Sequence, residues 1–316
     1  MKVLLCPEVS QELFEQVKAV SPALNVVMAS REAAAREAED AEVFYGYHSD
    51  EIVKAGKKLK WIQSGSAGMD KFLSPALMDS DILICNASGL HAPQVAEHAW
   101  ALTLGLCRGI PQYVRNQAER AWKGTPYMDL YGATAGIVGF GGIGKEYARR
   151  AHAFDMRIVT VDAHTKEKPA YVESLWGPER LNDLIRMSDV VFIAVPYTKE
   201  TEKLINAERL SMMKPTAFLV NTARGPIVDE QALTAALKAR QIAGAGLDVF
   251  EAEPLSKESE LWGLDNVLIT PHAAGSSALR PKRLMDFFCE NLRRHLAGQP
   301  LMNVVDKKRG YPVREG

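Results

Sequence analysis

The chain has 316 residues, of which 47% are hydrophobic and 24% are charged, and its formal net charge at pH 7 is -1. This balance is typical of a soluble globular protein, and the length predicts two domains rather than one. A nearly neutral chain argues against a dedicated nucleic-acid binder, because such proteins need a concentrated basic surface. The short basic stretch at 307–309 is interpreted as a solvated tail.

Cysteine spacing and apolar runs bear on where the protein works. The cysteines, Cys6, Cys85, Cys107 and Cys289, show no Cys-x-x-Cys spacing, which predicts reduced, mostly buried thiols and a cytoplasmic protein. The apolar start of the chain stops at residues 7 and 8, before it reaches the length of a signal peptide. No apolar run has the length that spans a bilayer. We therefore expect neither a membrane nor a nucleic acid as partner, and no metal site is predicted.

Short apolar runs alternate with amphipathic stretches along the chain, which is the pattern of an α/β protein with parallel sheets. In the first third, helices are predicted at 11–20 and 32–39, and strands at 3–5, 26–28, 43–45, 61–63 and 82–85. A second set of six strands is predicted at 135–139, 157–161, 190–195, 217–221, 245–249 and 267–270. Six strands with helices between them are the number expected of a complete dinucleotide-binding sheet.

Two longer helices, predicted at 95–108 and 281–297, are expected to carry the chain into and out of a second domain. Residues 1–100 would form the first part of one domain, residues 101–276 a dinucleotide-binding domain, and residues 277–316 the return to the first domain. A cleft between two domains is a common place for a ligand.

Residues 139–144, Gly-Phe-Gly-Gly-Ile-Gly, match the Gly-x-Gly-x-x-Gly pattern of dinucleotide-binding loops. The pattern alone is weak, because ordinary tight turns also need glycine. Here an apolar strand enters the loop and a helix leaves it, so Gly139 would make the turn, Gly141 would let the backbone approach a pyrophosphate, and Gly144 would let helix pack on strand. The helix N-terminus offers free N–H groups to the phosphates. The predicted cofactor contacts in this loop are Gly139, Gly141, Gly142, Ile143 and Gly144.

The second strand of this set ends at Asp162, about 20 residues past the loop. An acidic side chain at this position accepts hydrogen bonds from the adenosine ribose hydroxyls and repels a 2′-phosphate. The sequence therefore favours NAD over NADP as cofactor. His164, Lys166 and Lys168 follow closely and could soften that preference.

Polar residues follow three later strands of the same set, namely Arg224, Glu253 and His272. Because ligands of open α/β sheets bind beyond the carboxyl ends of the strands, these side chains are expected at the same edge as the glycine loop. Each one alone is equally well explained as a surface cation, a helix-entry acid or a turn residue. Three of them beside a nucleotide loop favour an active site.

Several motifs in order resemble the D-isomer-specific 2-hydroxyacid dehydrogenase family, which includes glyoxylate/hydroxypyruvate reductases and phosphoglycerate dehydrogenases. The resemblance covers nearly the whole chain. Besides the glycine loop and Asp162, its carriers are Val-Asn-Thr-Ala-Arg-Gly at 220–225, Gly-Leu-Asp-Val-Phe-Glu-Ala-Glu-Pro at 246–254, Thr-Pro-His at 270–272 and Val-Ala-Glu-His at 95–98. It implies two doubly wound parallel-sheet domains, a Rossmann NAD-binding domain inserted into a discontinuous, flavodoxin-like substrate domain, and usually a homodimer.

The resemblance also implies a catalytic set. Arg224 would bind the carboxylate and the carbonyl oxygen of the substrate with a bidentate fork that a lysine does not offer. His272 would be the acid–base, protonating the carbonyl oxygen as a hydride reaches the carbon, and Glu253 would orient the imidazole and favour its charged form. The implied function is NAD-dependent reduction of small 2-keto acids, or the reverse oxidation of D-2-hydroxy acids.

Further contacts are implied by the same resemblance. Asp248 would contact the nicotinamide amide. Ser66, Ala67 and Gly68 lie in a loop whose N–H groups would bind the substrate carboxylate, since consecutive N–H groups form an anion-binding nest. The other implied cofactor contacts are Val195, Pro196, Thr222, Ala223, Arg224, His272, Ala274 and Gly275.

Two features depart from the family pattern. His91 stands where many members carry asparagine, near the expected substrate mouth, and either alters substrate preference or is a tolerated variant. The segment 168–178 is longer than the minimal connection after Asp162, and would cover the adenine edge or form a surface elaboration.

Two alternative functions stay open on the same fold. A dinucleotide-sensing scaffold or corepressor can retain the catalytic residues. A phosphite dehydrogenase would also use Arg224 for a small anion, whereas formate enzymes of this group typically have glutamine at the position of Glu253.

Overall fold

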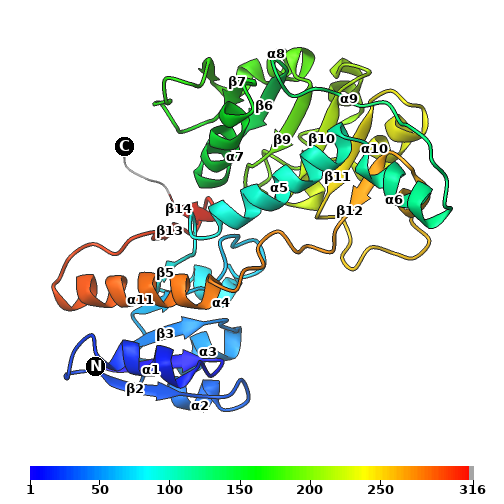
Figure 1. Ribbon diagram of the computed structural model, residues 1–316. Helices are drawn as coiled ribbons and strands as arrows, with labels where there is room; N and C mark the ends of the chain where they lie inside the picture. Colours follow the sequence, from blue (N-terminus) through cyan, green and yellow to red (C-terminus); the bar gives the residue numbers. More distant parts are fainter. Residues whose placement is uncertain (313–316) are drawn as a thin grey trace. The chain divides into compact units, whose positions relative to one another are not determined.

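The computed structural model describes residues 1–312 (Figure 1). The chain forms two compact units, which we call the split unit (Met1–His91 with Ser277–Gly316) and the inserted unit (Ala92–Ser276). The sequence placed the first division at residues 100–101, inside helix α5 (Ala92–Cys107), whereas the units divide where that helix begins. The reason is that α5 packs along its length on the sheet of the inserted unit.

The split unit contains a five-stranded sheet in the order β2-β1-β3-β4-β5, with every neighbouring pair parallel. Its strands are short and apolar, as their sequence pattern predicted, because helices cover both faces of such a sheet. They are β1 (Lys2–Cys6), β2 (Asn25–Met28), β3 (Val43–Gly46), β4 (Trp61–Gln63) and β5 (Leu83–Cys85).

The helices of the split unit are α1 (Gln11–Lys18), α2 (Ala34–Ala38), α3 (Asp50–Ala55), α4 (Pro75–Met78) and α11 (Arg280–Leu296). Helix α11 returns from the inserted unit and buries Leu284, Phe288 and Leu292 against side chains of β1, β3 and β4. A short antiparallel pair, β13 (Val305–Asp306) and β14 (Tyr311–Pro312), follows it. The predicted segments 11–20, 32–39 and 281–297 are therefore confirmed as helical, with shifted ends.

The inserted unit contains a seven-stranded parallel sheet in the order β12-β11-β10-β9-β6-β7-β8. Its strands are β6 (Thr134–Val138), β7 (Arg157–Val161), β8 (Ser174–Trp176), β9 (Val190–Ile193), β10 (Phe218–Asn221), β11 (Gly244–Leu247) and β12 (Val267–Ile269). The sequence predicted six strands, and the structure adds a seventh, β8, which lies within the segment 168–178 and pairs with β7. Its side chains are only half-buried, as befits an edge strand.

Helices cover both faces of this sheet. Buried side chains of α5 and α7 (Gly142–Ala153) pack on one face, and those of α8 (Leu181–Met187), α9 (Ala207–Met212) and α10 (Glu230–Lys238) pack on the other. The remaining helical pieces are α6 (Ile110–Ala118) and the 3-10 turns η1 (Pro178–Arg180), η2 (Gly225–Ile227) and η3 (Glu260–Gly263). The chain runs from β6 to β7 on one side and returns to β9 on the other, so the switch point lies at the carboxyl end of β6.

All cysteines are free and buried, as the sequence predicted. Burial is the main cause that raises the pKa of Cys85 and Cys107 to about 12 and that of Cys289 to about 11; it also raises the pKa of Cys6. Within residues 1–312, no helix is long and apolar enough to cross a membrane.

Candidate active site

The glycine loop joins β6 to α7 at the switch point. Gly139 has φ +100°, and a Cβ built on it would lie 2.7 Å from the carbonyl carbon of Ala194. A Cβ on Gly144 would lie 2.1 Å from the Gly139 carbonyl oxygen. By contrast, a Cβ on Gly141 would meet nothing within 4 Å. Packing thus requires glycine at the two ends of the loop, whereas the middle faces open space where a backbone can approach a ligand.

Asp162 follows β7 and holds the loop from the side. One carboxylate oxygen accepts the Phe140 N–H at 2.7 Å, and the other accepts the N–H groups of His164 and Thr165 at 2.8 and 2.7 Å. Burial alone would raise the pKa of this carboxyl, but the backbone N–H bonds from Thr165, Phe140 and His164 outweigh it and lower the pKa. A negative charge therefore stays fixed beside the glycine loop, while Lys168 donates to the Val172 carbonyl and not to Asp162.

The three predicted strand-end residues follow neighbouring strands of the sheet. Arg224 follows β10, Glu253 follows β11 and His272 follows β12. His272 Nδ1 lies 2.8 Å from Glu253 Oε2, and Glu253 Oε1 accepts the Phe250 N–H at 3.1 Å. The carboxylate is thus held from both sides, and because Nδ1 shares its proton with the carboxylate, Nε2 is the ring nitrogen that remains for another partner. The imidazole is 44% exposed, which leaves it accessible to a ligand.

The backbone of His272 is strained. Its φ is +53°, a left-handed conformation that residues with a Cβ seldom adopt. Its N–H donates to the Asp248 carbonyl at 2.8 Å, and the N–H groups of Ala273 and Ala274 donate to the two Asp248 carboxylate oxygens at 2.8 and 2.9 Å. Such strain persists only where surrounding bonds fix the conformation, and it is typical of functional sites.

Asp248 anchors this turn from within the protein. Its side chain has no exposed surface, and Thr270 Oγ1 donates to it at 2.6 Å. His98 Nε2 lies 2.8 Å from Thr270 Oγ1. Because the one hydroxyl proton goes to the carboxylate, His98 Nε2 must be the donor. The implied contact of Asp248 with the nicotinamide amide stays a prediction, and in this structure the carboxylate is enclosed and holds the His272 turn.

The other implied cofactor residues line the same edge. Thr222 is buried, and its hydroxyl has no hydrogen-bond partner among the described residues, which is costly unless a ligand supplies one. Arg224 Nη1 donates to the Ala223 carbonyl at 2.7 Å, and Gly275 faces open space. The open backbone at Gly141, the orphaned Thr222 hydroxyl and the fixed charge of Asp162 are the features that a dinucleotide would use.

In the loop at 64–68 of the split unit, the backbone carbonyls are all hydrogen-bonded, whereas several backbone N–H groups are not. The N–H groups of Gly65, Ala67 and Gly68 donate no hydrogen bond within the described chain, whereas every carbonyl of the loop accepts one. The donors to these carbonyls are Gln63 Nε2, Arg280 Nη2, His91 Nε2, the Ala87 N–H, Asn86 Nδ2 and Ser66 Oγ. A loop whose acceptors are occupied and whose donors are free attracts an anion.

Comparison with known proteins identifies the family of this chain. The description "D-isomer specific 2-hydroxyacid dehydrogenase, NAD binding domain" matches residues 100–274. The chain belongs to the D-isomer specific 2-hydroxyacid dehydrogenase family. As a member of it, the protein is an oxidoreductase, an NAD(P)-dependent 2-hydroxyacid dehydrogenase.

Relatives of this dehydrogenase carry more than one name. A glyoxylate reductase of Pyrococcus furiosus is 38% identical over 269 residues, which is 82% of this chain and 79% of that protein. A D-3-phosphoglycerate dehydrogenase of Archaeoglobus fulgidus is 34% identical over 97% of this chain but only 59% of its own length. A crystal structure of a family member from Xanthobacter autotrophicus, in complex with NADPH and MES, has a TM-score of 0.87 at 30% identity and covers 98% of this chain and 99% of that one.

Three residues of this dehydrogenase escaped the sequence reasoning. Asn86 and Arg280 hold carbonyls of the loop at 64–68, and Tyr47 accepts a hydrogen bond from Arg280 Nη2 at 3.1 Å. They come from three segments far apart in the chain, and no motif links them. His91, which was singled out, donates to the Gly65 carbonyl at 3.3 Å. Burial above all, and then the charge of Arg280, lower its pKa, so it serves the loop as a neutral donor.

Proposed function

We propose that this dehydrogenase reduces small 2-keto acids to D-2-hydroxy acids with NADH. The observation that carries the proposal is the pair formed by His272 Nδ1 and Glu253 Oε2, 2.8 Å apart at the carboxyl edge of the dinucleotide sheet. A histidine oriented by a carboxylate is the arrangement that delivers a proton to a carbonyl oxygen.

In the proposed reaction, a dinucleotide held by the glycine loop at 139–144 would supply the hydride for the carbonyl carbon. His272 Nε2 gives its proton to the carbonyl oxygen, and Glu253 stabilises the imidazolium form that exists before the transfer. Arg224 binds the substrate carboxylate and polarises the carbonyl, because a guanidinium fork places two donors in one plane. In the reverse direction His272 takes the hydroxyl proton of the D-2-hydroxy acid.

The cofactor preference rests on Asp162. Its carboxylate stays charged at the end of β7, where it would accept bonds from the ribose hydroxyls and repel a 2′-phosphate. Gly139 to Gly144 would cradle the pyrophosphate. Lining contacts would come from Val195, Pro196, Thr222, Ala223, Ala274 and Gly275, and the N–H groups of Ala67 and Gly68 would bind the substrate carboxylate, with Ser66 shaping the loop. A homodimer in the cytoplasm is part of the same proposal, and light scattering of the purified protein tests the dimer.

Steady-state oxidation of NADH and NADPH with glyoxylate, hydroxypyruvate and bulkier 2-keto acids tests the proposal. We expect turnover, with NADH preferred. His272→Ala should lower kcat by about 10²- to 10⁴-fold, because it removes the general acid, and should leave the Kd for NADH within about twofold. Thr270→Val should lower kcat by about tenfold, since it frees the strained turn without touching the reacting atoms, while Thr270→Ser should restore most of it.

The contrary results are distinct. If the protein binds the cofactor but turns over no 2-keto acid, the proposed reductase activity is contradicted and the dinucleotide-sensing scaffold is favoured. Reduction of NAD⁺ by phosphite, included as one assay, would instead favour the phosphite dehydrogenase.

A further inference from the structure

Three peptide groups of the loop at 64–68 are held by their carbonyls alone. The carbonyls and their donors are Ser64 with Gln63 Nε2 at 3.2 Å, Ser66 with the Ala87 N–H at 2.9 Å, and Ala67 with Asn86 Nδ2 at 2.6 Å. The same peptide groups carry the free N–H groups of Gly65, Ala67 and Gly68. Because each group is trans, its N–H points opposite to its carbonyl. Whatever holds the three carbonyls therefore sets the direction of the three free donors.

A chain of side-chain amides holds the first of these carbonyls. Asn291 of helix α11 pairs with the backbone of Met302, whose N–H it accepts at Oδ1 (2.8 Å) and to whose carbonyl it donates from Nδ2 (3.2 Å). Since a backbone N–H can only donate, the orientation of the Asn291 amide is fixed. Nδ2 also donates to Gln63 Oε1 at 3.1 Å. This bond directs Gln63 Nε2 to the Ser64 carbonyl and to the carbonyls at 85–86, at 3.2, 3.4 and 3.5 Å.

All three carbonyls turn toward the segment 85–87, so the free N–H groups point away from it on a common side. The polarity of the amide chain secures this arrangement. If the Gln63 amide turned over, Oε1 would face carbonyl oxygens and Nε2 would face the Nδ2 donor of Asn291. Gln63 is 1% exposed, and Asn291 and Asn86 are fully buried. Water therefore does not replace a lost partner, and one orientation is strongly preferred.

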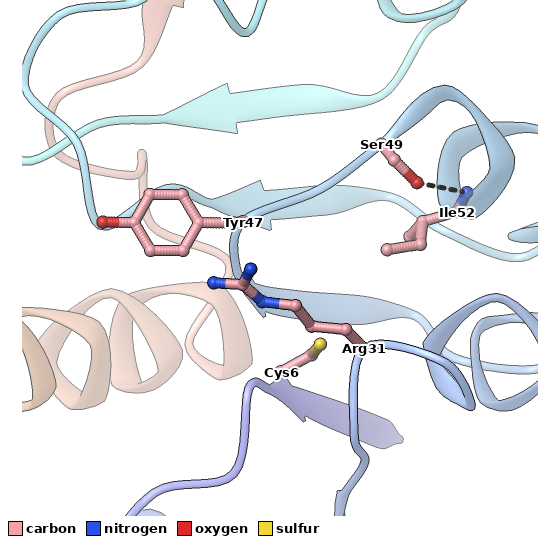
Figure 2. Close-up of a pocket in the computed structure, with 5 residues that line it drawn as sticks. All are labelled: Cys6, Arg31, Tyr47, Ser49 and Ile52. Carbon is pink, nitrogen blue, oxygen red and sulfur yellow. Dashed lines mark hydrogen bonds between the residues drawn. The ribbon is translucent and has the colours of Figure 1, made fainter. Parts of the chain in front are cut away.

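The open cavity of the same unit provides a contrast. It has a volume of about 340 Å³ and lies at the carboxyl ends of β1 and β3, where Arg31, Tyr47 and Ser49 supply its polar side chains (Figure 2). These three residues are exposed, so water competes for each hydrogen bond that they form. The amides behind the loop at 64–68 are enclosed, and this enclosure lets them fix the direction of a peptide group.

We propose that Gln63 and Asn291 are positioning residues for the substrate carboxylate. Asn291 orients the amide of Gln63, Gln63 holds the Ser64 carbonyl, and the Gly65 N–H thereby points to the side on which the other free N–H groups of the loop lie. The inference rests on the proposed function, in which N–H groups of this loop bind the carboxylate, and it adds Gly65 as a third donor. Both amide side chains act through the loop and not on the substrate itself.

The plain alternative is that these amides only stabilise the core of the split unit. The two ideas differ in KM and kcat. A carboxylate is bound equally in the ground state and in the transition state, so weaker binding of it raises KM and leaves kcat unchanged. We would measure both constants with NADH and the 2-keto acid of the panel above that has the highest kcat/KM. The dissociation constant of oxamate, an unreactive 2-keto acid analogue, from the NADH complex gives the same comparison without turnover.

Gln63→Met should raise KM and the oxamate dissociation constant by about tenfold, as the loss of one directed bond to a charged group implies, and should leave kcat within about threefold. Asn291→Asp keeps the acceptor for the Met302 N–H but places an oxygen opposite Gln63 Oε1, so it should have the same effect. Because Asn291 acts through Gln63, the double variant should bind no more weakly than Gln63→Met alone. Leu292→Ala, a fully buried neighbour on α11, is the matched control. It should lower the melting temperature and leave KM unchanged.

Circular dichroism and thermal denaturation identify any variant that fails to fold, and Asn291→Asp, which changes a single group, keeps the test open if Gln63→Met does not fold. If the folded variants leave KM and the oxamate constant within about twofold of the wild type, or if Leu292→Ala raises them as much, the amides only stabilise the core and the reductase stands. Additive losses in the double variant would contradict the action of Asn291 through Gln63. If no 2-keto acid is reduced, the proposed function itself is wrong, whereas the affinity for oxamate still tests the positioning residues.

Discussion

The glycine loop at 139–144 and the loop at 64–68 both present backbone N–H groups, but different contacts fix the shape of each loop. Each follows a buried parallel strand and leaves N–H groups free at the carboxyl edge of its sheet. The glycine loop is shaped by close packing, since Gly139 and Gly144 have no room for a Cβ. The loop at 64–68 is shaped by distant side chains that occupy its carbonyls, and a Cβ on Gly65 would meet Leu284 only at 3.6 Å. The shape of the glycine loop therefore depends on its own residues, whereas the shape of the loop at 64–68 depends on residues elsewhere in the chain.

The largest expected effect is that of Gly139→Ala. The new Cβ would lie 2.7 Å from the backbone of Ala194 in a left-handed conformation, which should lower the free energy of unfolding by on the order of 3 kcal/mol. NADH binding should weaken by more than tenfold. Gly65→Ala is the matched control and should change stability by less than about 0.5 kcal/mol. Chemical denaturation measures both, and equal losses in the two variants would erase the contrast between the loops.

An intermediate effect is expected from Asn86→Ala. Asn86 is fully buried and donates to the Ala67 carbonyl at 2.6 Å, while its Oδ1 accepts the Ser88 N–H at 3.0 Å. Its loss should lower kcat/KM for 2-keto acids by about tenfold and the free energy of unfolding by about 1–3 kcal/mol. The Kd for NADH, measured by fluorescence titration, should stay within about twofold. A matching rise in that Kd would show that the two loops do not act separately.

The smallest effect on stability is expected from Gly141→Ala. A Cβ there meets nothing within 4 Å and the residue has no positive φ, so the melting temperature of the cofactor-free protein should stay the same or rise slightly. NADH should nevertheless bind about tenfold more weakly, because the methyl group would separate the backbone from the pyrophosphate. Unchanged affinity would place the cofactor away from this side of the loop.

The same contrast explains what the sequence could predict. Strands such as β4 and β7 are short runs of apolar residues between helices, and their bounds were predicted to the residue. β8 was missed because its half-buried side chains lack that signature. The glycine loop, Arg224, Glu253 and His272 could be predicted as site residues because each lies within a local motif.

Other features depend on three-dimensional contacts that no local pattern encodes. The left-handed backbone of His272 arises from bonds to Asp248, whose enclosure is set by Thr270 and His98 from another element. Arg280 reaches Gly65 across 215 positions of the chain. Propensity and periodicity act over neighbouring residues and carry no information on such pairs.

The rate at which the buried thiols react with an alkylating reagent reports how often each unit opens. A protonated, enclosed sulfur reacts with an alkylating reagent only after the surrounding structure has opened. Cys107 lies in the inserted unit, whereas Cys6, Cys85 and Cys289 lie in the split unit. Pulsed alkylation followed by peptide mass spectrometry would therefore time the exposure of the two halves separately in the unmodified protein, and would show which of them ligand binding protects.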